Sequence, residues 1–85
     1  MDWITLDASD QGEEITLPDG SNVSLNTGSR LAYPAEFKGL KRTVKLEGEA
    51  FFEVARNEEI AFIVNVADEA STEVLGTSFH LKEDP

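Results

Sequence analysis

The sequence predicts an all-β fold, a small antiparallel β-sandwich or jelly-roll-like roll of about eight to nine short strands. Apolar and polar residues alternate along most of the chain, which is the period of a strand with one buried face. Turn residues recur about every 8–12 positions, as they do in small β-sandwiches. No segment keeps helical spacing over three turns, so a βαβ arrangement is excluded.

The N-terminal third is expected to contain a β-hairpin. Glu13–Leu17 and Ser21–Leu25 both alternate, and Pro18–Gly20 lies between them. Proline presets φ, aspartate favours the turn and glycine accepts the left-handed conformation, so this segment is typical of a tight connection. A further strand is expected over Trp3–Leu6, and the acidic segment Asp7–Glu14 is expected to be a surface loop.

A fourth strand is expected to end before the middle of the chain. Leu31 and Tyr33 continue the alternation as far as Pro34. Proline cannot donate a hydrogen bond to a central ladder, so the strand should stop there. Ala35–Leu40 is predicted to be a loop or a single helical turn.

The longest alternating stretch is Thr43–Ala55. Its apolar residues share one phase: Val44, Leu46, Ala50, Phe52 and Val54. Gly48 keeps that phase but has no side chain, which predicts a bend or a close backbone approach at this position.

The C-terminal third is predicted to add three short strands, over Ile60–Val66, Glu73–Leu75 and Ser78–Leu81. Ile60–Val66 alternates with Ile60, Phe62, Val64 and Val66 inward. The connections are expected to be a turn at Asn57–Glu59, a loop at Ala67–Ser71 and a turn at Gly76–Thr77.

The charge balance excludes two classes of partner. The 85 residues carry 17 acidic and 7 basic side chains, for a formal net charge of -10. Nucleic acids and anionic membranes are contacted through lysine and arginine, so neither is an expected ligand. The longest apolar run, Ile60–Val64, is far short of the roughly 20 residues that a spanning helix needs. A cationic patch on a protein partner remains plausible.

The chain offers little from which to build a catalytic or metal site. There is no cysteine, and the single histidine, His80, is expected to face outward or to lie at a sheet edge. No serine stands in a Gly-x-Ser-x-Gly context. Glu49 and Glu53 are roughly 13 Å apart along a strand, too far for a glycosidase-type pair. A nonspecific calcium site is left open, without EF-hand spacing, at Asp7, Asp10, Glu13 and Glu14. We therefore predict no enzyme, with no catalytic, cofactor-binding or metal-binding residues.

One aromatic residue suggests a contact surface. Phe51 falls in the outward phase of its strand between Glu49 and Glu53. Two readings stay open for Phe51: it packs under a loop or in a second small core, or it forms an exposed aromatic with an acidic rim that suits a basic-rimmed partner. The second reading makes Glu49, Phe51 and Glu53 the candidate partner surface.

A series of short blocks runs in order from about Gly12 to Leu81. The blocks are Ile15–Ser21, Val23, Leu25–Asn26, Gly28–Ser29, Leu31, Tyr33–Pro34, Phe37, Val44, Leu46, Gly48–Val54, Phe62, Val64 and Val74–Phe79. In order and spacing they resemble the periplasmic FecR domain of bacterial anti-sigma regulators, most closely the versions from Bacteroidetes. The matched residues are mostly core and turn positions, so the resemblance transfers fold better than it transfers a site.

The resemblance implies a periplasmic β-sandwich without catalytic residues or cofactors. Members of the family span the inner membrane, hold an extracytoplasmic-function sigma factor on the cytoplasmic side, and receive a signal from a TonB-dependent outer-membrane transporter. On this basis residues 1–85 are expected to be a single FecR-like periplasmic domain, a fragment of a longer membrane-anchored protein. It would act by contact with the transporter's signalling domain and with other domains of its own protein. In the family, the segment that follows this domain is often credited with receiving the signal.

Two other functions are kept as alternatives. The first is an extracellular or periplasmic module that binds a glycan or another small ligand. Sugar-binding surfaces usually need several exposed aromatics, whereas the one tryptophan, one tyrosine and five phenylalanines here fall mostly in the inward phase. The second is a purely structural stalk domain.

Overall fold

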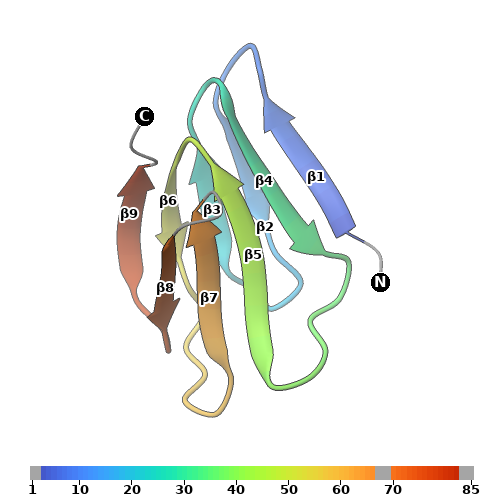
Figure 1. Ribbon diagram of the computed structural model, residues 1–85, viewed down its shortest axis with the longest axis vertical. Helices are drawn as coiled ribbons and strands as arrows, with labels where there is room; N and C mark the ends of the chain where they lie inside the picture. The colour runs from blue at the N-terminus through green and yellow to red at the C-terminus, as the bar shows by residue number, and fades with distance from the viewer. Residues whose placement is uncertain (1–2, 67–69, 83–85) are drawn as a thin grey trace.

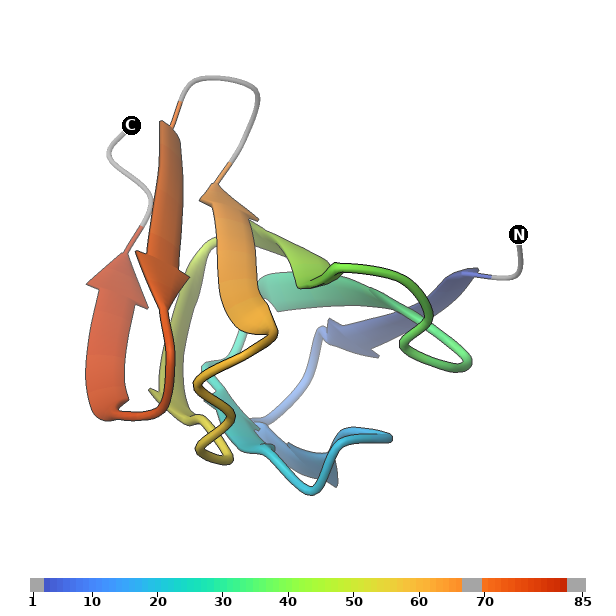
Figure 2. The same cartoon turned by 90° about the horizontal axis from the view of Figure 1, so that it is seen from below.

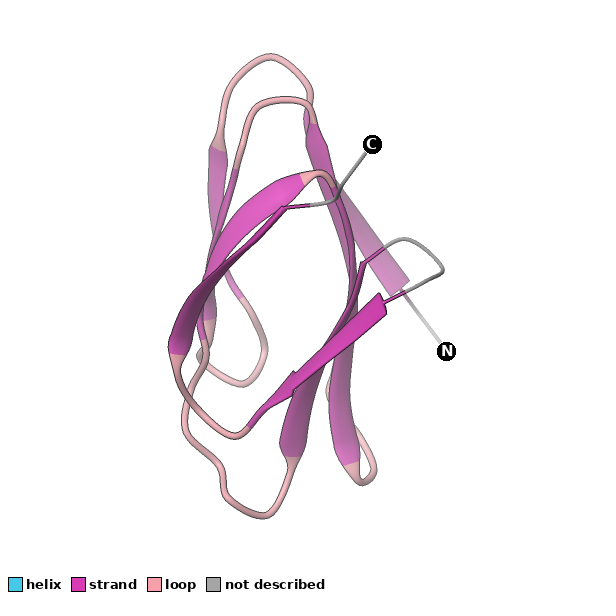
Figure 3. Cartoon of the chain, turned by 60° about the vertical axis from the view of Figure 1, so that its left-hand side comes forward, coloured by secondary structure: helices cyan, strands magenta, loops and turns pink. Residues whose placement is uncertain are grey.

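The computed structural model describes residues 3–66 and 70–82, and within these ranges it has nine strands and no helix. The strands form two sheets that pack face to face (Figures 1 and 3). This arrangement confirms the all-β sandwich that the alternation predicts.

The five-stranded sheet has the order β1-β4-β5-β7-β8. Its members are β1 (Trp3–Ala8), β4 (Ser29–Pro34), β5 (Lys41–Glu47), β7 (Ala61–Val66) and β8 (Ala70–Val74). The four-stranded sheet has the order β2-β3-β6-β9. Its members are β2 (Glu13–Thr16), β3 (Asn22–Leu25), β6 (Glu49–Glu53) and β9 (Ser78–Lys82).

One strand pair departs from the antiparallel prediction. β5 and β7 run in the same direction, with Lys41 opposite Ala61 and Leu46 opposite Val66. Between these two strands the chain crosses to the other sheet as β6 and then returns through residues 54–60 (Figure 1). Two crossings restore the original direction, so the two strands can pair only in parallel.

The alternating stretch Thr43–Ala55 contains two strands, β5 and β6, which belong to different sheets and meet at the bend at Gly48. Two predicted boundaries need correction. Asp7–Glu14 is only partly a loop, since β1 continues to Ala8 and β2 begins at Glu13. Of the loop expected at Ala67–Ser71, residues 70 and 71 belong to β8, because they pair with Val66 and Asn65 of β7. Residues 67–69 lie outside the described residues. The Ala35–Leu40 segment is a loop, as one of its two expected forms.

The core lies between the two sheets and is built from the inward phase of each strand. Phe52 of β6 and Phe62 of β7 come from opposite sheets, and their ring centroids are 6.3 Å apart in an edge-on arrangement. Phe52 also stacks on Phe79 of β9 at 5.2 Å, and Phe37 from the 35–40 loop meets the Phe62 ring edge-on at 6.1 Å. Such aromatic pairs add to the stabilisation that burial alone provides. The buried aliphatic residues around them are Ala8, Leu17, Val23, Leu25, Leu31, Val44, Leu46, Ala50, Val54 and Val64.

Gly48 is the point at which the chain passes from one sheet to the other. Its φ is 101°, in the left-handed region that residues with a Cβ rarely adopt. A Cβ built at Gly48 would stand only 2.8 Å from Cβ of Ser29. The Ser29 hydroxyl in turn accepts a hydrogen bond of 2.8 Å from the Glu49 N–H. The predicted close backbone approach at this glycine is therefore confirmed.

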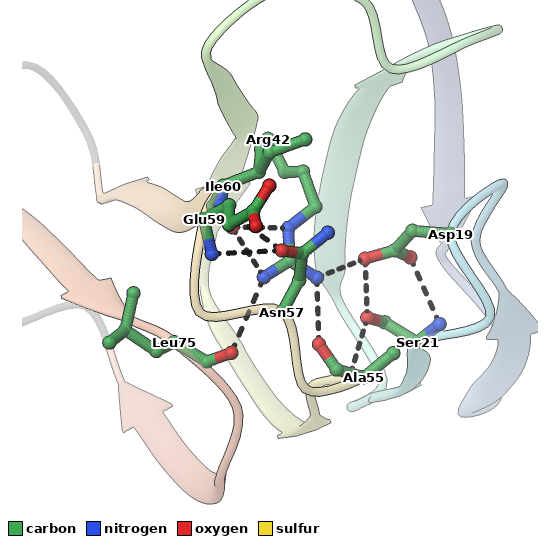
Figure 4. Close-up of polar contacts among 8 residues, drawn as sticks. All are labelled: Asp19, Ser21, Arg42, Ala55, Asn57, Glu59, Ile60 and Leu75. Carbon is green, nitrogen blue, oxygen red and sulfur yellow. Dashed lines mark hydrogen bonds and ion pairs between the residues drawn. The ribbon is translucent and has the colours of Figure 1, made fainter.

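A buried arginine closes one end of the sandwich (Figure 4). Arg42 lies in β5 in the same phase as Val44 and Leu46, and its side chain is only 4% exposed. Its guanidinium donates to three backbone carbonyls in two separate connections: Ala55 at 2.7 Å, Ile60 at 3.0 Å from Nε and 2.7 Å from Nη2, and Leu75 at a longer 3.5 Å. It also lies over the Phe62 ring, 5.4 Å from the centroid.

The charge of Arg42 is balanced by the tip of the β2–β3 hairpin. Asp19 accepts a hydrogen bond of 2.8 Å from the guanidinium and is itself held by the Ser21 hydroxyl and backbone N–H, at 2.8 and 2.9 Å. The buried Ser21 hydroxyl also accepts from the Ala55 N–H at 2.9 Å. A charge taken out of water is tolerated only when it is paired and hydrogen-bonded, and the Arg42 guanidinium meets both conditions. We call Arg42, Asp19, Ser21 and the three carbonyls the Arg42 cluster.

The Gly48 geometry predicts that Gly48→Ala destabilises the fold by about 2 kcal/mol or more, because a left-handed conformation and a steric clash combine. Urea unfolding followed by circular dichroism measures the change. Gly20→Ala is the matched control: its φ is 90°, but no atom lies within 4 Å of the added Cβ, so it should lose only about 1 kcal/mol. Equal losses in the two variants would contradict the close approach.

The Arg42 cluster predicts that Arg42→Met lowers the free energy of unfolding by about 3–5 kcal/mol, because it leaves the largely buried Asp19 carboxylate and three carbonyls without their partner. Arg30→Met is the control, since Arg30 pairs with Asp7 and Glu47 at 3.3 and 3.6 Å while about half of its side chain is exposed. That change should lose no more than about 1 kcal/mol. Similar urea midpoints for the two variants would show that the Arg42 cluster stabilises the fold no more than an exposed ion pair does.

Candidate functional site

The residues predicted to form a partner surface lie on the outer face of the four-stranded sheet. β6 alternates strictly, with Ala50 and Phe52 buried in the core and Glu49, Phe51 and Glu53 on the opposite face. The Phe51 side chain is 39% exposed, so the residue is not enclosed in a second core. The structure thus places all three predicted residues together on one open surface.

Cross-strand neighbours extend this surface on both sides of β6. Phe51 stands opposite Ser24 of β3 and His80 of β9. Glu53 stands opposite Asn22 and Ser78, and Glu49 stands opposite Lys82. We call Glu49, Phe51, Glu53 and these neighbours the Phe51 face. It combines one aromatic ring with hydrogen-bonding groups and charges of both signs.

Glu49 is the most constrained polar group on the Phe51 face. The Asn26 side-chain amide donates to Oε1 at 2.7 Å, and Nε2 of His80 lies 2.5 Å from Oε2. The hydrogen bond from Asn26 is the largest cause that lowers the Glu49 pKa below its ordinary value, followed by the bond with His80 and the positive charges of His80 and Lys82. Glu49 therefore stays ionised under mildly acidic conditions.

The Phe51 face also contains a polar hollow. It has a volume of about 400 Å³ and lies over β2 and β3, with Glu14, Thr16, Asn22 and Glu53 among its lining residues. Hydroxyl, amide and carboxylate groups gathered in this way can hydrogen-bond a polar or basic partner.

His80 lies where the alternation placed it. It is exposed on β9, which forms an edge of its sheet, so the expected outward or edge position is confirmed. Its contact with Glu49, and the contact of Asn26 with the same carboxylate, leave no signal in the sequence, because both join residues far apart in the chain.

The described residues show no metal-binding constellation. No group of three or more histidine, aspartate or glutamate side chains in ranges 3–66 and 70–82 could hold an ion. Asp7, one of the four acidic residues considered for calcium, lies 3.3 Å from Arg30. No helix of the described part is long and apolar enough to cross a membrane.

Comparison with solved structures finds two close matches, each a crystal structure of a protein assigned as an anti-sigma factor from Parabacteroides distasonis. The first is 42% identical over 94% of this chain with a TM-score of 0.90, and the second is 42% identical over 93% with a TM-score of 0.89. The matched parts are only 38% and 37% of those chains, so this chain spans well under half the length of its relatives. No curated protein matches the sequence.

Comparison with protein families finds the FecR protein family, matched over residues 6–85. This range contains the Arg42 cluster, the Phe51 face and both sheets except for the first three residues of β1. The family model matches nearly the whole chain, and on this ground the chain belongs to the FecR protein family.

Proposed function

We propose that this chain is a periplasmic signalling module of a FecR-type anti-sigma factor. It relays a signal from a TonB-dependent outer-membrane transporter toward an extracytoplasmic-function sigma factor, and it does so by protein–protein contact without catalysis. Family membership over residues 6–85 supports this proposal. Residues 1–85 then form one periplasmic domain of a longer inner-membrane protein, and the contact with the sigma factor lies in another part of that protein.

The Phe51 face is the proposed contact surface for the transporter's signalling domain. The observation that carries this assignment is a large aromatic side chain exposed on the outer face of a sheet, with Glu49 and Glu53 two residues away on either side. Aromatic residues surrounded by polar groups are typical of the energetically important centres of protein interfaces. The flanking carboxylates favour a partner with a basic rim.

The alternative of a glycan-binding module has less support. The exposed aromatics in the described ranges are Phe51 and Trp3. They lie on the outer faces of different sheets, β6 and β1, and so cannot stack against the same sugar.

The proposal predicts that the isolated periplasmic signalling domain of the cognate transporter shifts the backbone NMR signals of residues 49–53 and 78–82 in a saturable manner. Phe51→Ser should weaken the interaction about tenfold or more while leaving the other backbone signals in place, because Phe51 is an anchor of the surface but not of the core. Leu40→Ser is the matched control: Leu40 lies in the 35–40 loop, which connects two strands of the five-stranded sheet, and this variant should bind as the wild type does. Absence of shifts at about 1 mM, or shifts away from the Phe51 face, would assign signal reception to another part of the protein.

A second prediction concerns the ionisation of Glu49. Asn26→Ala should raise the Glu49 pKa toward the ordinary carboxylate value, because it removes the largest cause of the lowering, and His80→Ala should raise it less. A pH titration of the side-chain carboxyl carbon by NMR measures both. Since a lowered pKa favours the ionised form, the contribution of these hydrogen bonds is present at neutral pH and is lost as the pH falls through the folded-state value. An unchanged Glu49 pKa in Asn26→Ala would show that the hydrogen bond from Asn26 does not lower it.

A further inference from the structure

An apolar groove lies at the opposite side of the molecule from the Phe51 face. It has a volume of about 550 Å³, and its apolar walls are Trp3, Pro34, Phe37 and Leu40. Leu40 is 88% exposed and Trp3 is 38% exposed, which makes them two of the five large hydrophobic residues that the described chain leaves open to solvent. Figure 2 shows β1 and the 35–40 loop together on the side of the molecule away from β9.

The groove is held open by the fold. Phe37 packs edge-on against the buried Phe62 ring, which anchors the 35–40 loop to the core. Pro34 ends β4, and Trp3 begins β1 directly opposite it in the ladder. The Trp3 ring is covered on one side by Lys45, whose Nζ lies 5.1 Å from the ring centroid. Three of the four apolar walls, Trp3, Pro34 and Phe37, are thus held in place before any partner arrives, which reduces the entropy that binding must overcome.

The rim of the groove is basic, unlike the chain as a whole. Lys38 and Lys41 line it, and Lys45 stands over Trp3, so three of the seven basic residues gather here. One carboxylate, Glu36, also lines the groove and lies 3.4 Å from Nζ of Lys38. In a chain with a net charge of -10, three lysines beside an exposed apolar groove make this a local site for an anionic partner.

We propose that this groove binds an acidic segment of another protein, which inserts one large apolar side chain between Trp3 and Leu40 and sets its aspartates or glutamates against Lys38 and Lys41. An apolar pocket with a charged rim is the usual anatomy of an interface centre. The site is separate from the Phe51 face and does not depend on the function proposed for it.

The charges and shapes of this chain argue against two other occupants. A second copy would offer Phe51 between Glu49 and Glu53, but that residue lies on a sheet face and is only 39% exposed, and two chains of charge -10 repel each other. An anionic membrane presents a broad plane of negative charge to the whole acidic chain and is repelled by it. A short acidic segment is also subject to the net charge, but it carries few charges and sets them directly against Lys38 and Lys41, where local attraction outweighs the more distant, salt-screened repulsion.

The test uses Trp3, the only tryptophan of the chain, as a fluorescent reporter inside the groove. Three capped five-residue peptides serve as probes: a phenylalanine flanked by two aspartates on each side, the same peptide with serine in the centre, and the same peptide with lysines in place of the aspartates. The first should shift the Trp3 emission in a saturable manner. The serine and lysine peptides should bind at least about tenfold more weakly.

Two variants and salt separate the contributions of shape and charge. Leu40→Ser removes an exposed wall without touching the core, and it should weaken binding of the first peptide about fivefold or more. Lys38→Gln combined with Lys41→Gln should do the same and should remove most of the salt dependence. Phe51→Ser is the matched control and should bind the peptide as the wild type does.

Four results would overturn the proposal. They are no saturable change with the first peptide up to about 10 mM, equal binding of the lysine peptide, association of the chain with itself in sedimentation that Leu40→Ser abolishes, and Trp3 shifts with anionic phospholipid vesicles but not with the peptide. The last two would assign the groove to a second copy or to a membrane surface.

Discussion

The rest of the structure depends on the hydrogen bonds and the ion pair that the buried Arg42 guanidinium makes. It carries a full charge into the interior, where an unpaired charge would cost several kcal/mol. The structure tolerates it because Asp19 supplies the opposite charge and the carbonyls of Ala55 and Ile60 occupy its other N–H groups. These partners come from the β2–β3 hairpin and the β6–β7 connection, and Leu75 adds a longer contact from the β8–β9 turn. The Arg42 side chain therefore joins three connections that are far apart in the sequence and link strands of both sheets.

This polar closure complements the aromatic core. Phe52 and Phe62 hold the two sheets together from the inside, while Asp19 and Ser21 tie the hairpin tip to the Ala55 connection at one end. With the interior and one end closed, the outer faces of the sheets are left for other proteins. The Phe51 face and the apolar groove beside Trp3 and Leu40 lie on different sheets and differ in charge, since carboxylates flank Phe51 and lysines surround the groove. Under the two proposals, one small module contacts two different proteins through opposite faces.

The alternation of the sequence was enough to predict the strands and the outward position of Phe51, because side-chain period depends only on local residues. It could not predict that β5 pairs with β7 in parallel, or that Asn26 and His80 converge on Glu49, because these contacts arise from long-range pairing. The burial of Arg42 is visible in the sequence, because a charged residue in phase with Val44 and Leu46 must be buried with a partner. The groove had no such signal, since Trp3 and Leu40 meet only in the folded chain.

With these hydrogen bonds in place, the Arg42 cluster should make the 54–60 connection as rigid as the core, although that connection is not a strand. Native-state hydrogen exchange tests this most directly, through the amides of Ala55 and Asn57, which donate to the Ser21 hydroxyl and to the Leu75 carbonyl at 2.9 and 2.8 Å. We expect both amides to exchange only on global unfolding, at the rate of Phe62 in the buried strand β7. Exchange as fast as that of Lys38 or Gly39 in the exposed 35–40 loop would show that this end of the sandwich opens on its own, and would contradict the central role of Arg42.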